Sequence, residues 1–595
     1  MNPEPRTLAD LFFKSVSHDL DRHVMMKRGS TWQVISSRQL YGYVVAMAKA
    51  LQQWGIKKGD RVAILSENRP EWMIVDFACV STGIIDVPIY STLTAEQSLY
   101  VLQNSGARVA CVSTEEQLRK LQKIQPQTNV EKIVVFDDVA EVNVAPIWHI
   151  LHDAPTEKDQ DFEQAAHHVG PEDIATLIYT SGTTGRSKGV MLTHWNLMSN
   201  ALMSTKYAEW IPGDLYLSFL PLSHVTARHL DYVCYLNGVS IAYCPYFDQL
   251  PQMLQETKPT IIVAVPRVYE KVRQEAERKA GTGLKRKIFN WALAVGRRHK
   301  EEIERGAKPS SPAWKLADKL VYSKLRQGFG GRSRIYFSGG APLGFDMSEW
   351  FCCMGIPIFE GYGLTETSPV ISSNRLGAFK VGSVGKVHEE LEVKVAPDGE
   401  ILVKGSTVFK GYWQMPEETR AAFEDGWFKT GDIGEIDNEG FLSITDRKKD
   451  LIKTSGGKFI APQPIENALK ANVLVAQAAL IGDRRKYASV IISPHFPLLE
   501  DWARANGVTF SNHQELVASA RVRDLYRGIV EDLNKKLAQF ESIKKILIVP
   551  DEFTVAGGEI TPTLKLKRRV IEAKYKEQIE ELYQEPHPVE TAPVG

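Results

Sequence analysis

One stretch of the sequence, IYTSGTTGRSKGV at residues 178–190, combines residue types that can hold an anion. Glycine lets a ligand approach the backbone closely, hydroxyl side chains donate hydrogen bonds, and lysine supplies a compact cation. The residues that offer these groups are Thr180, Ser181, Gly182, Thr183, Thr184, Gly185, Lys188 and Gly189. Because the N–H groups of such a loop can converge on one anion, we predict a phosphate-binding loop.

Two other interpretations fit this loop less well. The Walker A pattern requires four residues between its glycines and a hydroxyl residue after the lysine, whereas only two residues separate Gly182 from Gly185 and a glycine follows Lys188. A flexible surface loop seldom follows an apolar strand as closely as this stretch follows the apolar run that begins at Ile174.

Strand-like and helix-like runs alternate on both sides of the loop. This βαβ rhythm predicts largely parallel sheets covered by helices, with ligands at the carboxyl ends of the strands. It occurs once before the loop and again after it, so we expect two such layers. The strand-like runs are residues 61–66, 85–90, 108–113, 132–137, 240–245, 260–266 and 334–340.

The pattern changes after Val381. Two hairpins with PDG and NEG turns, EVKVAPDGEILVKG and EIDNEGFLSITDR, predict a small β subdomain. Strand-like and helical runs follow DRKKD (446–450). We therefore predict an α/β protein whose large N-terminal domain, residues 1–447, has two βα-layered subdomains plus a small β subdomain. A smaller α+β C-terminal domain, residues 448–583, and a disordered tail, residues 584–595, complete it.

The composition indicates a globular protein with no strong overall charge. Lys+Arg and Asp+Glu number 72 each among 595 residues, so no overall field attracts nucleic acid. The six cysteines form no CxxC pair, which argues against zinc and for a reducing compartment. No apolar run suits a signal peptide or a membrane span. We expect a cytoplasmic protein without a nucleic-acid partner, and leave open a homodimer and peripheral contact with the inner face of the membrane.

A basic segment, residues 271–305, interrupts the βα rhythm. It reads as helix and carries eleven Lys or Arg against five Glu. Either it is a solvated helical face, or it is a docking surface for acidic lipid headgroups or for the phosphates of a substrate.

Several short motifs follow the opening loop, and they matter as an ordered set. With them the sequence resembles the adenylate-forming enzymes of the acyl-CoA synthetase superfamily, and VPRVYEKV and PTLKLKRR resemble the long-chain fatty acid branch. The resemblance extends from about residue 8 to 580. Its motifs after the opening loop are FLPLSHVTAR (219–228), VPRVYEKV (265–272), SGGAPL (338–343), EGYGLTETSPV (360–370), FKTGDIG (428–434), DRKKDLIKTSGGKFIAP (446–462) and GEITPTLKLKRRV (558–570).

The resemblance implies a reaction in two steps, with ATP, Mg²⁺ and coenzyme A. A fatty carboxylate attacks the α-phosphorus of ATP to give an acyl-adenylate and pyrophosphate, and the thiol of coenzyme A then displaces AMP. The opening loop would hold the β- and γ-phosphates. One departure is visible, because the family usually has proline where Ser187 stands, which affects the rigidity of the loop and no charged group.

The resemblance also assigns the nucleotide contacts. Tyr362 would stack on adenine, and Thr365 and Glu366 would hold Mg²⁺. Asp432 would accept both ribose hydroxyls, with Arg447 donating to the same sugar. From the local pattern alone, these residues would be a turn, a solvated carboxylate, an Asx-turn and a surface arginine. The full set that the family assigns to ATP or AMP beyond the loop is Gly340, Ala341, Gly361, Tyr362, Gly363, Thr365, Asp432 and Arg447.

The remaining implied roles concern the acid, the thiol and domain movement. His224 would orient the acyl carboxylate, and Arg228 is a candidate gate of the acyl tunnel that would act through an ion pair. Lys565 would bridge the carboxylate and the α-phosphate. Because this lysine would obstruct the thiol, the family rotates its mobile C-terminal domain about a hinge, here Lys449, which brings Gly456 to the coenzyme A tunnel. Locally, His224 reads as a structural histidine and KLKRR as a solvated patch.

Two rival functions stay open at this point. One is a fatty acyl-AMP ligase that passes the adenylate to a carrier protein, which here would act in trans because only 25 residues follow Val570. The other is a non-catalytic nucleotide-binding homologue. Release of free acyl-CoA separates the first from an acyl-CoA synthetase, and acid-dependent pyrophosphate exchange separates the second.

Overall fold

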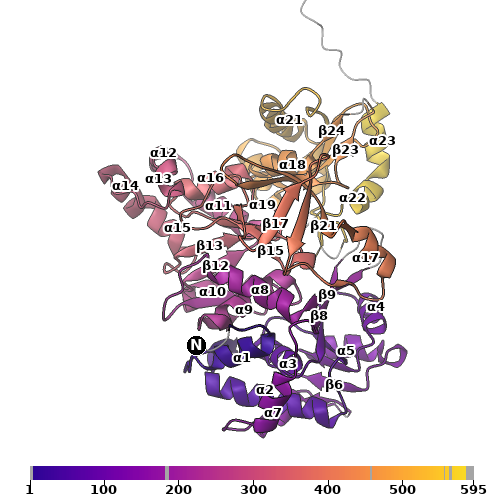
Figure 1. The fold of residues 1–595 in the computed structure, drawn as a ribbon. Coiled ribbons are helices and arrows are strands. Elements are labelled where there is room, and N and C mark those ends of the chain that lie inside the picture. The colour runs from indigo at the N-terminus through magenta and orange to yellow at the C-terminus, as the bar shows by residue number, and fades with distance from the viewer. Residues whose placement is uncertain are drawn as a thin grey trace, which may run out of the picture.

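The computed structural model describes residues 4–141, 143–180, 187–455, 458–554, 557–561 and 566–584. In Figure 1, two sheet-and-helix layers make up the N-terminal part, and a small β unit lies next to them. The C-terminal unit lies at the end of the molecule opposite α1 (Leu8–Val16) and α2 (Ser37–Gln53).

An eight-stranded sheet forms the first layer, in the order β19-β9-β8-β4-β3-β5-β6-β7. Every residue of β4 and β5 is buried, as expected of parallel strands that helices cover on both faces. The edge that contains β19 is different, because β9 runs antiparallel to both β8 and β19. The strands are β3 (Arg61–Leu65), β4 (Ile85–Ile89), β5 (Val109–Val112), β6 (Lys132–Val135), β7 (Ala145–Pro146), β8 (Ile174–Thr180), β9 (Lys188–Thr193) and β19 (Gly411–Tyr412).

A nine-stranded sheet forms the second layer, in the order β16-β15-β14-β13-β12-β10-β11-β1-β2. Its last two strands come from the start of the chain, which the sequence did not predict. Val24 of β1 lies opposite Ile241 of β11 in a parallel pair. The strands are β1 (Val24–Arg28), β2 (Thr31–Ile35), β10 (Leu215–Ser218), β11 (Ser240–Tyr243), β12 (Ile261–Ala264), β13 (Ile335–Ser338), β14 (Phe359–Gly363), β15 (Val370–Ser373) and β16 (Lys386–Val387).

Helices between the strands cover both sheets and supply most of the continuous apolar core. Those that bear on the site are α3 (Pro70–Val80), α4 (Ala95–Ser105), α5 (Glu115–Gln122), α8 (His194–Thr205), α9 (Val225–Leu236), α10 (Leu250–Thr257) and α16 (Phe345–Cys353).

The predicted β subdomain is a five-stranded antiparallel sheet in which β22 pairs with β21. The C-terminal unit has a three-stranded sheet and its own apolar core around Leu480, Val490 and Tyr526. The predicted fold class is confirmed. The elements are β17 (Leu391–Val395), β18 (Glu400–Gly405), α17 (Pro416–Ala422), β20 (Phe423–Glu424), β21 (Trp427–Ile436), β22 (Leu442–Arg447), β23 (Ile452–Lys453), β24 (Phe459–Ile460), α18 (Pro462–Lys470), β25 (Val475–Ile481), β26 (Ala488–Pro494), α19 (Phe496–Ala505), α20 (His513–Ala518), α21 (Ala520–Asn534), β27 (Ile543–Ile548), α22 (Arg568–Lys574) and α23 (Lys576–Gln584).

The basic segment predicted as one helical run forms three helices: α11 (Pro266–Ala280), α12 (Gly283–Arg298) and α13 (Lys300–Glu304). The break falls at Gly281, whose φ of +53° glycine adopts more readily than other residues do. Helix α14 (Pro312–Ala317) packs on α12. Within the described ranges, no helix combines the length and the apolar character needed to cross a bilayer.

Candidate active site

Two of the predicted nucleotide residues, Arg447 and Tyr362, converge on the carboxylate of a third, Asp432. Strands β21 and β22 form the second predicted hairpin, and their register places Asp432 opposite Arg447. Arg447 Nε lies 2.8 Å from Asp432 Oδ1, and the Tyr362 hydroxyl donates to Asp432 Oδ2 at 2.8 Å. Both carboxylate oxygens are therefore oriented by donors from two different strands.

The electrostatics of this cluster favour its charged form. Burial alone would lower the pKa of Arg447, but Asp432 and, more weakly, Glu366 outweigh it and raise that pKa. Burial, then the charge of Asp432, raise the pKa of Tyr362 far above its ordinary value, so its hydroxyl stays a donor. The Arg447 side chain is 34% exposed, against 4% for Asp432. The cluster is thus open on the arginine side.

The backbone around Tyr362 needs glycine for close approach. A Cβ on Gly363 would lie 1.7 Å from the carbonyl oxygen of Pro369, so no other residue fits there. Gly361 pairs with Ser373 of β15, and Thr365 and Glu366 belong to the 3₁₀ turn η4 (Thr365–Thr367) that follows. The turn puts Glu366 four residues beyond the tyrosine, on the same connection.

A second cluster links the opening loop to Glu366 through Tyr412. The Tyr412 hydroxyl donates to Glu366 Oε1 at 2.9 Å, and Lys188 Nζ lies 4.9 Å from the centroid of the Tyr412 ring. Tyr412 was not among the site residues predicted from the sequence. Its only signal was an aromatic residue after Gly411 in FKGYW, which is too common to single out.

The opening loop connects two antiparallel strands, with Thr180 of β8 opposite Lys188 of β9. Gly189 serves packing, since a Cβ there would lie 3.1 Å from Tyr179 Cζ. The Tyr100 hydroxyl donates to the Ser187 carbonyl oxygen at 2.9 Å, which anchors the end of the loop. The predicted residues Ser181, Gly182, Thr183, Thr184 and Gly185 lie outside the described residues, and so do Gly456 and Lys565.

The SGGAPL segment leaves β13 beside β14. Gly340 has a φ of +80°, which glycine tolerates best, and Ala341 follows it. The buried Glu360 of β14 accepts a hydrogen bond from the Leu343 N–H at 3.1 Å, which ties this segment to the strand that carries Tyr362. Burial raises the pKa of Glu360 to about 7.

His224 begins α9 as its N-terminal cap. Its Nδ1 accepts a hydrogen bond from the Thr226 N–H at 3.1 Å. This contact fixes the ring on the loop after β10, at the carboxyl end of a sheet strand. Its predicted contact with an acyl carboxylate stays a prediction.

Arg228, the candidate gate, lies at zero exposure between the two layers. It forms ion pairs with Asp76 of α3 and Asp86 of β4, which are also fully buried. Its Nε donates to the Tyr232 hydroxyl at 2.7 Å, and Nη1 donates to Thr176 Oγ1 at 2.8 Å. The expected ion pair is present, but these partners fill the polar groups of the arginine and favour a structural brace.

The predicted hinge, Lys449, is an exposed residue between the β subdomain and the C-terminal unit. Partial desolvation of its ammonium group is the main cause that lowers its pKa. Contacts across this boundary include the Gln463 N–H donating to Asp446 Oδ2 at 2.9 Å and a 3.6 Å ion pair between Lys470 and Glu270. The boundary is therefore polar, which suits a surface that separates and re-forms.

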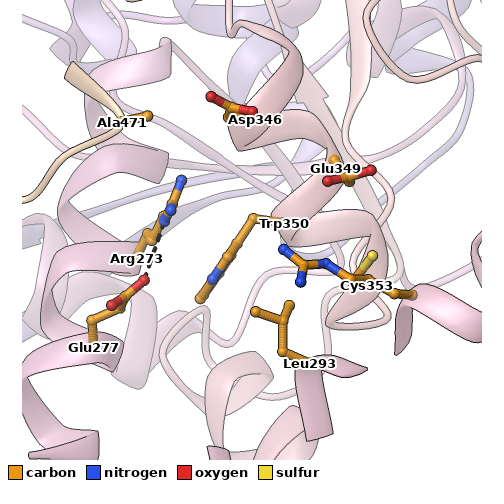
Figure 2. A pocket seen from close by; sticks show the side chains of 9 residues that line it. Arg273, Glu277, Leu293, Asp346, Glu349, Trp350, Cys353 and Ala471 are labelled. Atoms are coloured by element: carbon orange, nitrogen blue, oxygen red, sulfur yellow. Dashed lines mark hydrogen bonds and ion pairs between the residues drawn. The ribbon is translucent and has the colours of Figure 1, made fainter. Parts of the chain in front are cut away.

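A pocket of about 150 Å³ lies between α11, α12 and α16 (Figure 2). Arg273 and Trp350 face each other across it, and Ala471 of the C-terminal unit closes one side. No predicted site residue that the structure describes lines this pocket, so it is separate from the clusters around Asp432 and Glu366.

The donor set suits Mg²⁺ only in combination with phosphates. Glu366 Oε1 accepts from Tyr412, and Oε2 has no hydrogen bond to a described residue. Mg²⁺ commonly takes one or two carboxylates and completes its shell with water and phosphate oxygens. Among the described residues there is no group of three or more His, Cys, Asp or Glu that could hold a metal alone.

Comparison with solved structures defines the class of protein. The chain has the fold of the anthranilate CoA ligase AuaEII, solved with anthranoyl-AMP, at a TM-score of 0.75 and 21% identity over 97% of this chain and 99% of that one. ATP-bound MatB from Rhodopseudomonas palustris gives a TM-score of 0.70 at 25% identity, over 96% and 99% of the two chains. This is the fold of adenylate-forming ligases.

Comparison with sequences gives the family. The model of the AMP-binding enzyme family matches residues 12–413, and that of the AMP-binding enzyme C-terminal domain matches residues 449–587. The chain belongs to the AMP-binding enzyme family. It is 36% identical to the long-chain-fatty-acid–CoA ligase FadD15 of Mycobacterium tuberculosis, over 98% of this chain and 97% of that protein. The peroxisomal long chain acyl-CoA synthetase 7 of Arabidopsis thaliana is 32% identical, over 98% and 87%. The predicted enzyme class, a ligase, is confirmed.

Proposed function

We propose that the protein activates a long-chain fatty acid with ATP and transfers the acyl group to coenzyme A, releasing AMP and pyrophosphate. The observation that carries this proposal is the convergence of Arg447 and Tyr362 on Asp432. A carboxylate has about four lone-pair sites, so Asp432 can accept two ribose hydroxyls in addition to these donors. The names of the relatives support the acid and the thiol.

In the first step an anion must approach a polyanion, so positioned cations and donors supply most of the rate gain. Lys188 and the loop after Thr180 would surround the β- and γ-phosphates. Mg²⁺, when bound at Glu366, would neutralise phosphate charge. The acyl carboxylate, oriented by His224, attacks the α-phosphorus while the bond to pyrophosphate breaks, and Lys565 would neutralise the charge between the two reactants.

In the second step, the thiol of coenzyme A must occupy the position that Lys565 would hold in the first step. A rotation of the C-terminal unit about Lys449 would withdraw this lysine and bring Gly456 to the thiol channel. The polar boundary described above supports such a movement, since its ion pair and hydrogen bond can exchange with water. The thiolate then attacks the acyl carbonyl, and AMP leaves. Lys565→Ala should therefore abolish adenylate formation and spare thioester formation from supplied acyl-AMP.

The test is acid-dependent exchange of pyrophosphate into ATP, with acids from acetate to C20, followed by coenzyme A. We expect exchange with long acids and acyl-CoA only after coenzyme A is added. The matched pair is Asp432→Asn and Asp425→Asn, because Asp425 is an exposed turn residue of the same subdomain with a φ of 49°, which asparagine tolerates. Exchange without acyl-CoA release would instead indicate an acyl-AMP ligase.

A further inference from the structure

Helix α12 presents a cationic surface that the proposed reaction does not use. Its sequence, GLKRKIFNWALAVGRR, has five Lys or Arg and no Asp or Glu. Together with α13 and α14 it projects at the edge of the molecule, well away from the β subdomain that carries Asp432 (Figure 1). A role in the active site is therefore not available to explain its charge.

One face of α12 combines exposed apolar and cationic side chains. Leu284 is 73% exposed and Trp291 is 36% exposed. Lys287, Ala294 and Arg298 are exposed as well, and these five residues follow one another at spacings of three, four, three and four along the helix. At 3.6 residues per turn they form one outward stripe. The residues of α12 that join the core are Phe289, Ala292 and Val295.

The cations of α12 are mostly without ionic partners. Arg286 pairs with Glu277 at 3.3 Å, whereas the others have no ion pair to any described residue. Lys285 and Arg286 also lie in the first turn, where the helix dipole disfavours positive charge, whereas Arg297 and Arg298 lie in the last turn, where it favours positive charge. Ion pairs with described residues do not compensate the charge of Lys285 and Lys287 at the start of the helix, so an external anion is the partner that this end suits. The four cations of α12 that form no ion pair with a described residue are Lys285, Lys287, Arg297 and Arg298.

We propose that α12 docks the protein on the surface of an anionic phospholipid bilayer. Lysine and arginine would bind the headgroups, Leu284 would enter the acyl boundary, and Trp291 would lie at the interface, where tryptophan is enriched. The exposed Leu316 of α14, which packs on α12, extends this mixed surface. An acidic protein or a nucleic acid would use the cations but leave the exposed leucine side chains without a function.

Docking would place the enzyme beside the membrane, where long-chain fatty acids partition. This consequence rests on the proposed function, but docking itself does not. The two are therefore measured separately, binding with vesicles and catalysis with soluble octanoate in the absence of vesicles.

The experiment is co-flotation of the full chain with vesicles of equal phosphatidylglycerol and phosphatidylcholine, against pure phosphatidylcholine, at low salt. We expect binding to the anionic vesicles only. Lys285→Gln, Lys287→Gln and Arg298→Gln combined should lower the partition coefficient at least tenfold, and Trp291→Ala should lower it about threefold. All variants should keep the octanoate rate, because these residues are remote from the site.

The matched control removes three exposed cations from α21 and the turn that follows it, with Arg523→Gln, Arg527→Gln and Lys536→Gln. It should bind vesicles as the wild type does. Equal loss in this control, or full binding by the α12 variant, would overturn the proposal. So would binding to poly-glutamate through α12 without binding to anionic vesicles, which would identify an acidic protein as the partner.

Discussion

Two arginines of this protein sit beside aspartates in very different surroundings. Arg228 is sealed between the two βα layers, with Asp76 and Asp86 equally buried. Arg447 faces Asp432 at the rim of the β subdomain, with a third of its side chain exposed. Sealed charges can only stabilise an interface, whereas a half-open pair keeps hydrogen-bonding capacity for a ligand. Exposure, more than charge, separates a brace from a binding site.

The carboxyl groups beside the two arginines also differ in their tendency to hold a proton. One guanidinium faces two carboxylates around Arg228, and burial raises the pKa of Asp76 well above its ordinary range. This shift favours a proton on Asp76, and one proton would make the buried cluster neutral. This neutrality is what a fully buried network requires.

The largest effect is expected from Arg228→Met. Removing the cation leaves Asp86 buried without a counter-charge, so the N-terminal part should lose about 3–5 kcal/mol in its free energy of unfolding. Urea unfolding measures this loss. Adding Asp76→Asn and Asp86→Asn should restore part of it. A stable single variant with altered affinity for palmitate-length acids would contradict the brace and favour the gate.

Asp432→Asn should have the second largest effect, and on activity instead of stability. The amide cannot accept both ribose hydroxyls, so kcat/KM for ATP should fall about 100-fold, or roughly 2.7 kcal/mol. Its free energy of unfolding should change by less than about 1 kcal/mol, because Arg447 remains partly hydrated. Pyrophosphate exchange tests the predicted loss of activity and urea unfolding tests the predicted stability, with Asp425→Asn as the control for both. A large loss in the free energy of unfolding with intact pyrophosphate exchange would show that Asp432 has a structural role and does not bind the nucleotide.

The free energy of unfolding should also depend on pH, through a buried histidine of the N-terminal part. His194 accepts a hydrogen bond from the Leu8 N–H, and burial lowers its pKa to about 3. The unfolded chain takes up this proton below about pH 6.5. Stability is therefore lost as the pH falls from there, by about 2 kcal/mol at pH 5. Urea titrations of His194→Asn, which keeps an acceptor near the same place, should show a smaller loss between pH 7 and 5.

The smallest effect should come from Tyr362→Phe. It keeps the ring and removes the hydroxyl that donates to Asp432, a contribution of about 1 kcal/mol. KM for ATP should rise about fivefold in steady-state kinetics, while Tyr362→Ala, which also removes the stacking face, should raise it further. Equal effects of both substitutions would argue that the ring does not contact adenine.

The sequence allowed part of this site to be predicted. The NEG turn implied a hairpin, and a hairpin brings Asp432 and Arg447 together although fourteen residues separate them. Local patterns likewise predicted several strands of each layer, namely β3, β4, β5 and β6 in the first and β11, β12 and β13 in the second, because parallel buried strands are short continuous apolar runs.

Other features depended on contacts between distant segments. The partners of Arg228 come from α3, β4 and β8, so no local pattern relates them. The same is true of β1, which joins a sheet through a strand more than two hundred residues away. Tyr412 reaches Glu366 only because β19 pairs with β9. These contacts depend on packing between segments that are distant in the sequence, and the hydrophobic periodicity of a single segment does not predict such packing.

The most direct test of the comparison is a crystal structure with a non-hydrolysable palmitoyl-AMP analogue. We predict both ribose hydroxyls within about 3 Å of the Asp432 carboxylate and no ligand atom in contact with Arg228. A nucleotide bound away from Asp432, or an acyl chain lying against Arg228, would contradict the account.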